Sequence, residues 1–213
     1  MEKKDMKKLL HIIATPRGEE SRTLKISASF LQSFQETHPD WIIEPFDLTK
    51  TSIPSLTVKR VDGKYVLLQG KDLHGTLKES WDEIVKYIQH FLSADGYLIS
   101  TPMWNFNIPY FLKQYLDIIV QPKYLFQYTK TGAVEGFVKN RKMVIITSRG
   151  GEYTSVDTKK FDLQEPYLRT IFEFVGISDI QFINAQPMDM GEELQKQRIE
   201  QAKILAKQIA TQF

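Results

Sequence analysis

Five short apolar runs recur along the chain, and an amphipathic segment follows each of them. The first run, at 9–15, is continuous rather than alternating, as expected of a strand that is covered on both faces. Strands that alternate with helices form a parallel sheet, because each helix carries the chain back to the start of the next strand. The pattern predicts a three-layered α/β protein, with strands at 9–15, 41–48, 96–101, 142–148 and 179–185 and helices at 21–37, 73–95, 109–120, 165–176 and 192–213.

The connections between these elements carry further signals. Ser21 stands where the first helix needs an N-cap. Pro45 places the second strand at an edge of the sheet, because proline cannot donate a ladder hydrogen bond. Residues 49–72 are expected to be a long, mixed connection, and residues 123–137 a hairpin around Gly132. We find no repeat, low-complexity tract or linker, so residues 1–213 are expected to form one domain.

The composition disfavours several classes of function. The formal net charge of +2 is too small to indicate nucleic-acid binding, and the basic cluster at residues 1–8 is expected to be a solvated tail. The chain has no cysteine, which rules out disulfides, thiol catalysis and cysteine-ligated metals. No stretch reaches the roughly 20 apolar residues of a membrane span, and the first apolar run leads into Pro16 and Arg17 rather than a cleavage site. We expect a cytoplasmic protein that binds neither nucleic acid nor membrane.

The four histidines do not indicate a metal site. His11 falls inside a predicted strand, where a histidine is usually a hydrogen-bonded interior residue rather than a catalytic base. The other three fall in helices or at helix ends, without the spacing of metal ligands. Ser148 precedes Arg149 and does not stand in a G-x-S-x-G turn, which disfavours acyl transfer. We therefore expect no metal.

Three loops hold the residues expected to carry function, because ligands of open parallel sheets bind beyond the carboxyl ends of the strands. The loops are 15–23, 101–109 and 147–155. The first leads into a predicted helix whose free N–H groups favour an anion, and Arg17 adds positive charge. It is neither a G-x-G-x-x-G nor a lysine-bearing P-loop. Its hydroxyls can bind phosphate or simply cap the helix, and the sequence leaves both readings open for Thr15, Ser21 and Thr23.

The other two loops indicate a flat ligand. Residues 102–109, PMWNFNIP, interleave Met, Trp and Phe with Asn between two prolines, a stiff segment suited to lie against a ring. Gly150 and Gly151 permit unusual φ angles and let backbone N–H groups approach a ligand closely, although a tight turn is the alternative. A single ligand with a phosphate at one end and a planar heteroaromatic system at the other accounts for all three loops. FMN has that form.

These motifs closely resemble those of the FMN-dependent NADH-azoreductase family of flavodoxin-like quinone and azo-compound reductases, and the resemblance covers essentially the full chain. Residues 103–106 are similar to the family's Met-aromatic-Asn-Phe flavin loop, and residues 148–151 to its Ser-Arg-Gly-Gly loop. The resemblance implies a five-stranded parallel sheet in the order 2-1-3-4-5 with helices on both faces. It also implies an FMN site formed by Thr15, Arg17, Ser21, Arg22, Thr23, Pro102, Met103, Trp104, Asn105, Phe106, Ser148, Arg149, Gly150 and Gly151.

The resemblance further implies a homodimer, in which Tyr128 and Phe174 lie near the substrate; Phe174 is equally well explained as a core residue. Quinones or azo compounds would accept two electrons from NADH or NADPH in a ping-pong hydride transfer through flavin N5. Basic residues such as Arg60 offer contacts to a 2′-phosphate but form no motif, so the choice of nucleotide stays open.

Three other functions are alternatives to the reductase. They are an electron carrier of the flavodoxin kind, a general flavin reductase that releases FMN, and a non-enzymatic sensor of flavin or quinone. Flavodoxin carriers are usually shorter and strongly acidic, whereas this chain is slightly basic and carries long insertions. We therefore expect the two-electron reductase.

Overall fold

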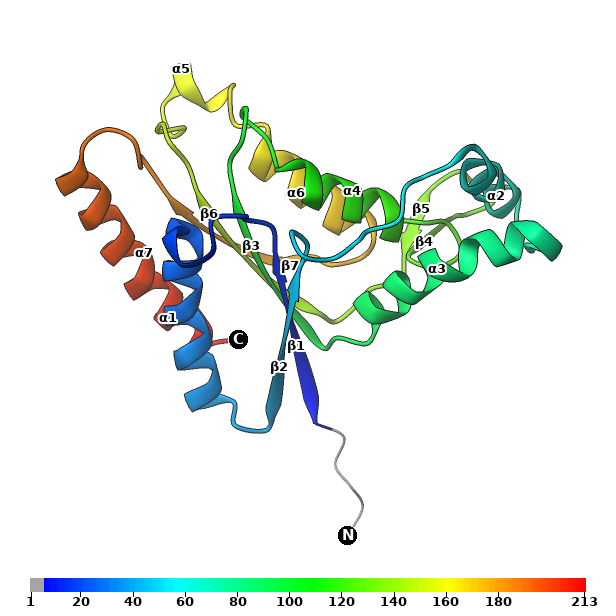
Figure 1. Ribbon diagram of the computed structural model, residues 1–213, viewed down its shortest axis with the longest axis horizontal. Coiled ribbons are helices and arrows are strands. Elements are labelled where there is room, and N and C mark those ends of the chain that lie inside the picture. The colour runs from blue at the N-terminus through cyan, green and yellow to red at the C-terminus, as the bar shows by residue number, and fades with distance from the viewer. Residues whose placement is uncertain (1–5) are drawn as a thin grey trace, which may run out of the picture.

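The computed structural model describes residues 6–213, so most of the predicted basic tail, residues 1–5, lies outside the described residues. A five-stranded parallel sheet runs through the centre (Figure 1). Its order is β2-β1-β3-β6-β7, which confirms the predicted order because the two strands of the hairpin stand apart from this sheet. The strands are β1 (Lys7–Ile13), β2 (Trp41–Asp47), β3 (Gly96–Pro102), β4 (Phe126–Tyr128), β5 (Val134–Gly136), β6 (Lys142–Ser148) and β7 (Asp179–Ala185).

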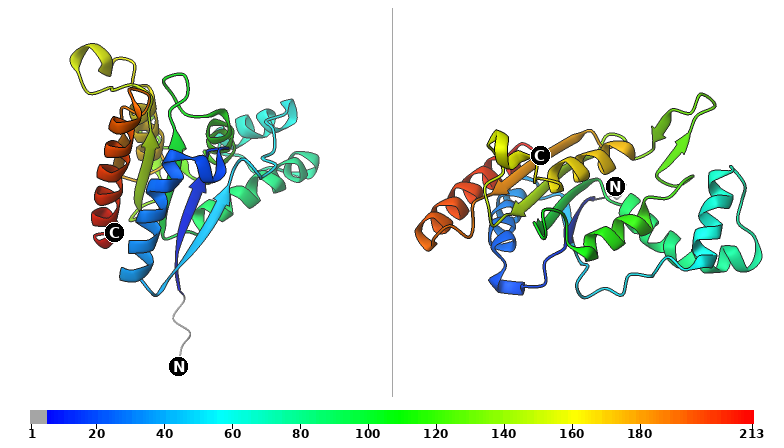
Figure 2. Two further views of the ribbon diagram at one scale, coloured as in Figure 1. Left: turned by 60° about the vertical axis from the view of Figure 1, so that its left-hand side comes forward. Right: turned by 90° about the horizontal axis from the view of Figure 1, so that it is seen from above.

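Helices cover both faces of the sheet, as Figure 2 shows from two further directions. One layer consists of the first and last helices, which lie side by side, and the other contains α3, α4 and α6. The helices are α1 (Arg22–Thr37), α2 (Val58–Leu68), α3 (Gly75–Leu92), α4 (Tyr110–Ile119), α5 (Val156–Lys159), α6 (Gln164–Phe174) and α7 (Glu192–Thr211), and a 3-10 turn, η1 (Gly18–Glu20), precedes α1.

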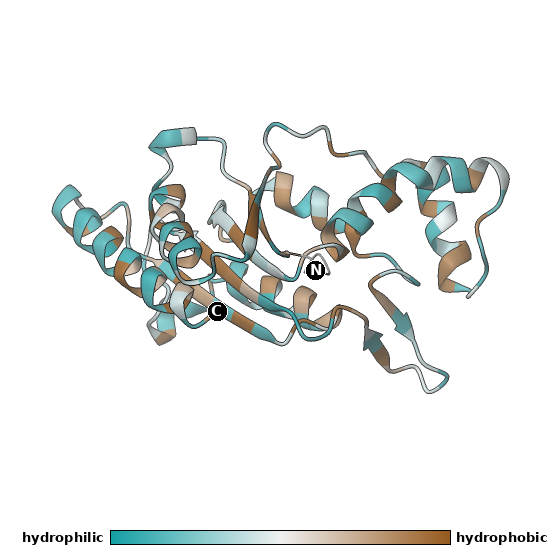
Figure 3. Ribbon diagram, turned by 90° about the horizontal axis from the view of Figure 1, so that it is seen from below, coloured by the Kyte–Doolittle hydropathy of each residue, from teal (hydrophilic) through white to brown (hydrophobic). Residues whose placement is uncertain are grey.

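The strands have apolar side chains on both sides because each side faces its own core. In β1, Leu9 packs with Phe30 of α1, while the next residue, Leu10, packs with α3 and α4 on the opposite face. The inner strands β3 and β6 alternate in the same way. Figure 3 shows the same distribution, with apolar residues gathered along the sheet and the helix sides that face it. This two-sided burial is the physical reason for the continuous apolar runs in the sequence.

The sequence predictions hold for the sheet and fail in two connections. Pro45 lies in the edge strand β2, as predicted, and residues 126–136 form the predicted hairpin with Gly132 at its turn (φ 82°). The 49–72 connection contains α2, which was not predicted, and the loop after β6 contains the short α5. Among residues 6–213, no helix is long and apolar enough to cross a membrane.

His11 is an interior residue, as predicted. It is 4% exposed in the centre of β1, and its Nε2 lies 2.7 Å from Oγ of Ser100 in β3. Burial disfavours the charged imidazolium and lowers the pKa of His11 to about 4, against a weaker opposing effect of the Asp47 carboxylate. The imidazole is therefore neutral at pH 7.

We predict that His11 makes the fold less stable as the pH falls. The unfolded chain takes up the proton near the ordinary imidazole pKa of 6.5, whereas the folded protein takes it up only near about 4, so protonation favours unfolding within that window. Between pH 7 and pH 5, wild type should lose about 2 kcal/mol more of its free energy of unfolding than His11→Gln. Urea titrations at both pH values measure this difference, and equal losses in the two proteins would contradict it.

Candidate functional site

A cavity of about 240 Å³ lies at the edge of the sheet where β1, β3 and β6 end. The parallel register sets Pro102 opposite Ser148, and Met103 N–H donates to the carbonyl of Ser148 over 2.9 Å, so the loops after β3 and β6 run side by side. The cavity is lined by Thr15, Arg17, Ser21, Arg22, Thr23, Pro102, Met103, Trp104, Ser148, Arg149, Gly150, Met188 and Asp189.

The first loop brings hydroxyl groups to the start of α1. Ser21 is the N-cap, because its Oγ accepts a hydrogen bond from the N–H of Leu24 over 3.3 Å. The same Oγ lies 3.1 Å from Oγ1 of Thr15. The capping role predicted for Ser21 is thus confirmed. The first N–H groups of a helix have no intrahelical partners, and the cap satisfies that of Leu24. Arg17 is exposed beside them. An anion is the natural occupant of such a helix end.

A buried chain of polar groups lies beneath this end of the cavity. Oγ of Ser100 is hydrogen-bonded to Oγ of Ser27 (2.6 Å) as well as to His11, and Ser27 in turn donates to the carbonyl of Thr23 (3.0 Å). Oγ1 of Thr23 is 2.7 Å from Oγ of Ser148. These bonds connect β1, β3, α1 and β6 and fix the hydroxyl-bearing side chains relative to one another.

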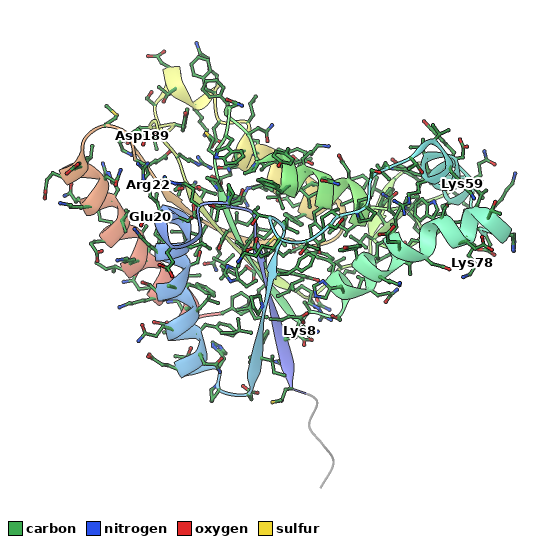
Figure 4. All side chains as sticks on the ribbon, in the orientation of Figure 1. Lys8, Glu20, Arg22, Lys59, Lys78 and Asp189 are labelled. Atoms are coloured by element: carbon green, nitrogen blue, oxygen red, sulfur yellow. The ribbon has the colours of Figure 1, made fainter. Side chains whose placement is uncertain are left out.

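The side chain of Arg22 is paired with an acidic residue that the sequence did not suggest. Its Nη1 lies 2.6 Å from Oδ1 of Asp189, in the loop after β7 (Figure 4). The N–H of Asp189 donates to the carbonyl of Gly150 over 3.1 Å, and that of Met188 to the carbonyl of Arg149 over 2.9 Å. The loop after β7 is therefore a fourth wall of the cavity. Met188 and Asp189 follow the strand without any recognisable motif, so only the sheet order could have suggested them.

The aromatic loop after β3 has a left-handed backbone at two residues without glycine. Asn105 has φ 47° and Phe106 has φ 68°. A pair of hydrogen bonds between Trp104 and Asn107, of 2.8 and 2.9 Å, closes this turn. Trp104 and Phe106 are 38% and 47% exposed, which is unusual for such large apolar groups. The loop thus exposes aromatic surface, and Trp104 is the aromatic residue of the loop that lines the cavity.

The glycine pair differs from the expectation in its geometry. Neither Gly150 nor Gly151 has a positive φ, so the unusual φ angles foreseen for them do not occur. What the pair provides is space, since a Cβ on Gly150 would contact the carboxylate of Asp189 and one on Gly151 the hydroxyl of Tyr153. A close approach of this backbone to a ligand stays a prediction.

Arg149 lines the cavity, but its guanidinium is hydrogen-bonded to two residues outside the cavity lining, Thr147 and Asp162. It is 1% exposed, and Nη1 pairs with Oδ2 of Asp162 at 2.8 Å while Nε donates to Oγ1 of Thr147 over 3.1 Å. Breaking a buried ion pair by removing one partner typically destabilises a protein by about 3–5 kcal/mol. We therefore interpret the arginine as the anchor of its loop rather than as a free cation.

Some predicted site residues lie apart from this cavity. Asn105 lines an adjoining cavity of about 400 Å³ together with Trp104, Pro109 and Tyr110, while Phe106 and Gly151 line neither.

Tyr128 and Phe174 are not brought to either cavity within one chain. Phe174 packs against Phe126 with ring centroids 4.6 Å apart, and Tyr128 lies 55% exposed on the hairpin. Figure 1 shows this hairpin away from α1, and its strand β5 contacts α6. Within residues 6–213 no cluster of three or more acidic or histidine side chains is suited to hold a metal ion.

Comparisons with known proteins agree with this geometry. The family described as flavodoxin-like fold matches residues 7–209. A protein of Coprothermobacter proteolyticus named FMN-dependent NADH:quinone oxidoreductase is 39% identical over 98% of this chain and 100% of its own length. A protein of Caldicellulosiruptor saccharolyticus with the same name is 37% identical over the same shares.

A solved structure from Bacillus anthracis, an FMN-dependent NADH-azoreductase in complex with FMN, has a TM-score of 0.81 and 30% identity, and it covers 96% of this chain and 100% of its own. The chain therefore belongs to the flavodoxin-like fold family. Within that family it groups with the proteins named as NADH:quinone oxidoreductases and azoreductases, which confirms the resemblance found in the sequence.

Proposed function

We propose that this protein is an FMN-dependent NADH:quinone oxidoreductase that also reduces aromatic azo compounds. The observation that carries the proposal is the cavity at the ends of β1, β3 and β6, with a hydroxyl-rich helix start on one side and an exposed aromatic loop on the other. The names of the relatives, which are similar over nearly the whole chain, support it.

The residues at the helix start fit the phosphate of FMN. Thr15, Ser21 and Thr23 supply hydroxyls, the first turn of α1 supplies N–H groups, and Arg17 supplies an exposed positive charge. A mononucleotide needs one such phosphate site and no second nucleotide site, which favours FMN over FAD.

The loops after β3 and β6 fit the ring system. Trp104 and its neighbours offer a flat apolar surface, and the segment at Gly150 leaves room for a ligand to approach the backbone. We propose that residues 102–106 and 148–151 together hold and orient the flavin.

When bound, FMN would supply the redox chemistry between NADH and the acceptor, so the protein needs no strong acid of its own. The side chains around the cavity bind and orient, and the aromatic loop admits one flat ring at a time. Donor and acceptor would consequently bind in turn, which is the ping-pong order. A two-electron transfer avoids radical products, consistent with a role in detoxification.

The structure gives little support for NADPH through Arg60. The guanidinium of Arg60 donates to the carbonyls of Ser80 (2.9 Å) and Ser55 (2.7 Å) and pairs with Glu83, so it is already occupied. We propose NADH as the donor, in line with the names of the relatives.

We further propose that the active form is a cytoplasmic homodimer in which each chain is one domain. The hairpin presents Tyr128 to solvent, and within one chain neither Tyr128 nor Phe174 reaches the cavity. A second copy would allow these aromatic side chains to face the partner's flavin.

The first test of the proposal is turnover. Purified protein loaded with FMN should oxidise NADH steadily when a quinone such as menadione is added, and should bleach a soluble azo dye under the same conditions. Absorbance at the NADH band follows the reaction. Binding of FMN without any turnover would contradict the enzyme and leave the carrier and the sensor as alternatives.

The phosphate site can be tested without turnover. Arg17→Met should raise the FMN dissociation constant about ten- to a hundredfold, because a hydrogen bond to a charged group is worth about 1.5–3 kcal/mol. Riboflavin lacks the phosphate and is the control ligand, so its affinity should not change. Fluorescence titration measures both. Equal weakening of FMN and riboflavin would show that Arg17 does not meet the phosphate.

We predict that light scattering gives twice the mass of the single chain at working concentrations. Tyr128→Ala should then slow reduction of the acceptor, because the proposed dimer places this side chain where the acceptor meets the partner's flavin. The dissociation constant of FMN should stay within about twofold of wild type, because the residues proposed to hold the phosphate and the ring belong to the loops after β1, β3 and β6. A monomer with full turnover would refute this arrangement.

A further inference from the structure

Gln164, the first residue of α6, is a buried amide in which only one of the two polar side-chain atoms is hydrogen-bonded. It is 0% exposed, and its Nε2 donates to the carbonyl of Pro102 over 2.8 Å. Its Oε1 has no hydrogen-bond partner among the described residues. A buried acceptor without a partner destabilises a fold, and an apolar side chain of the same length would avoid that penalty. The one bond to Pro102 is therefore the feature that distinguishes glutamine from methionine at this position.

That bond is one of three from consecutive residues to the loops proposed to hold flavin. Asp162 pairs with Arg149 of the loop after β6, and its other oxygen accepts from the N–H groups of Gln164 and Glu165, each over 3.1 Å. The N–H of Leu163 donates to the carbonyl of Phe106 over 3.1 Å. We call residues 162–164 the α6 clamp, because each of them holds a different point of the two loops.

The aromatic loop depends on being held from outside. Asn105 and Phe106 have positive φ angles without being glycine, and such a conformation is strained and persists only where surrounding contacts enforce it. The hydrogen bonds between Trp104 and Asn107 close the turn but do not fix its direction. The α6 clamp contacts the aromatic loop at two points, at Pro102 before the turn and at Phe106 within the turn.

We propose that the α6 clamp, and Gln164 in particular, positions the aromatic loop for flavin without touching the flavin itself. None of the residues 162–164 lines the cavity of about 240 Å³. Gln164 is thus a positioning residue, and its contribution to affinity passes through the carbonyl of Pro102. This inference rests on the proposed function, since it assigns the loop's ligand as flavin.

The test compares Gln164→Met with a matched control, Gln121→Met. Gln121 is also 0% exposed, its Oε1 also lacks a partner among the described residues, and its Nε2 donates to the carbonyl of Asp117 over 2.6 Å. Gln121 follows the C-terminal end of α4, whereas the aromatic loop precedes the N-terminal end of the same helix. Both variants remove one hydrogen bond and one unsatisfied acceptor, so both melting temperatures should stay within about 3 °C of wild type. Only Gln164→Met should raise the FMN dissociation constant, by about three- to tenfold.

A second readout needs no flavin. In the flavin-free protein, hydrogen exchange at the amides of Trp104 and Asn107 should be faster in Gln164→Met than in wild type, and unchanged in Gln121→Met. Equal exchange at these amides in all three proteins would overturn the inference. If wild type failed to bind FMN, the proposed function would fall, whereas the exchange comparison would still decide whether Gln164 holds the loop.

Discussion

The parallel pairing of β3 with β6 sets Pro102 directly opposite Ser148, and most of the candidate site follows from that register. Parallel strands end at a common edge, so loops that are far apart in sequence meet there. The 2.9 Å hydrogen bond from Met103 to Ser148 extends the pairing one step into the loops. A shift of one residue would turn every side chain of β6 to the opposite core, which explains why this arrangement is strongly specified.

Buried polar groups support the candidate site, although burial among apolar side chains disfavours such groups. The chain of hydrogen bonds from His11 through Ser100 and Ser27 runs between apolar side chains, and Arg149 and Gln164 are fully buried. Apolar residues could fill the same volumes at lower desolvation cost. These groups fix the loops at the sheet edge. We therefore infer that their burial lowers the free energy of unfolding but fixes the geometry of the candidate site. Binding residues commonly lie on loops that a rigid sheet positions.

The sequence predicts the sheet well because two-sided burial leaves an unmistakable continuous apolar run. It does not indicate α2, because Gly63 in the middle of that helix weakens helix propensity. The reason for this glycine is tertiary, since a Cβ there would collide with the buried ring of Trp81. Most of the residues predicted from the recognisable loops line one cavity, whereas Asp189 could not be predicted because it lies in the loop after the neighbouring strand β7, which carries no motif. The conformation of the glycine pair was also misjudged, since glycine there provides room rather than a left-handed φ.

We propose that one ligand occupies the ends of β1, β3 and β6, with its phosphate at the start of α1 and its ring along the aromatic loop. A crystal structure of the protein with FMN is the decisive test. The phosphate should lie within hydrogen-bond distance of the hydroxyls of Ser21 and Thr23, and the ring system should lie against Trp104. Flavin bound with its ring at the start of α1, or bound only in the adjoining cavity beside Tyr110, would contradict it.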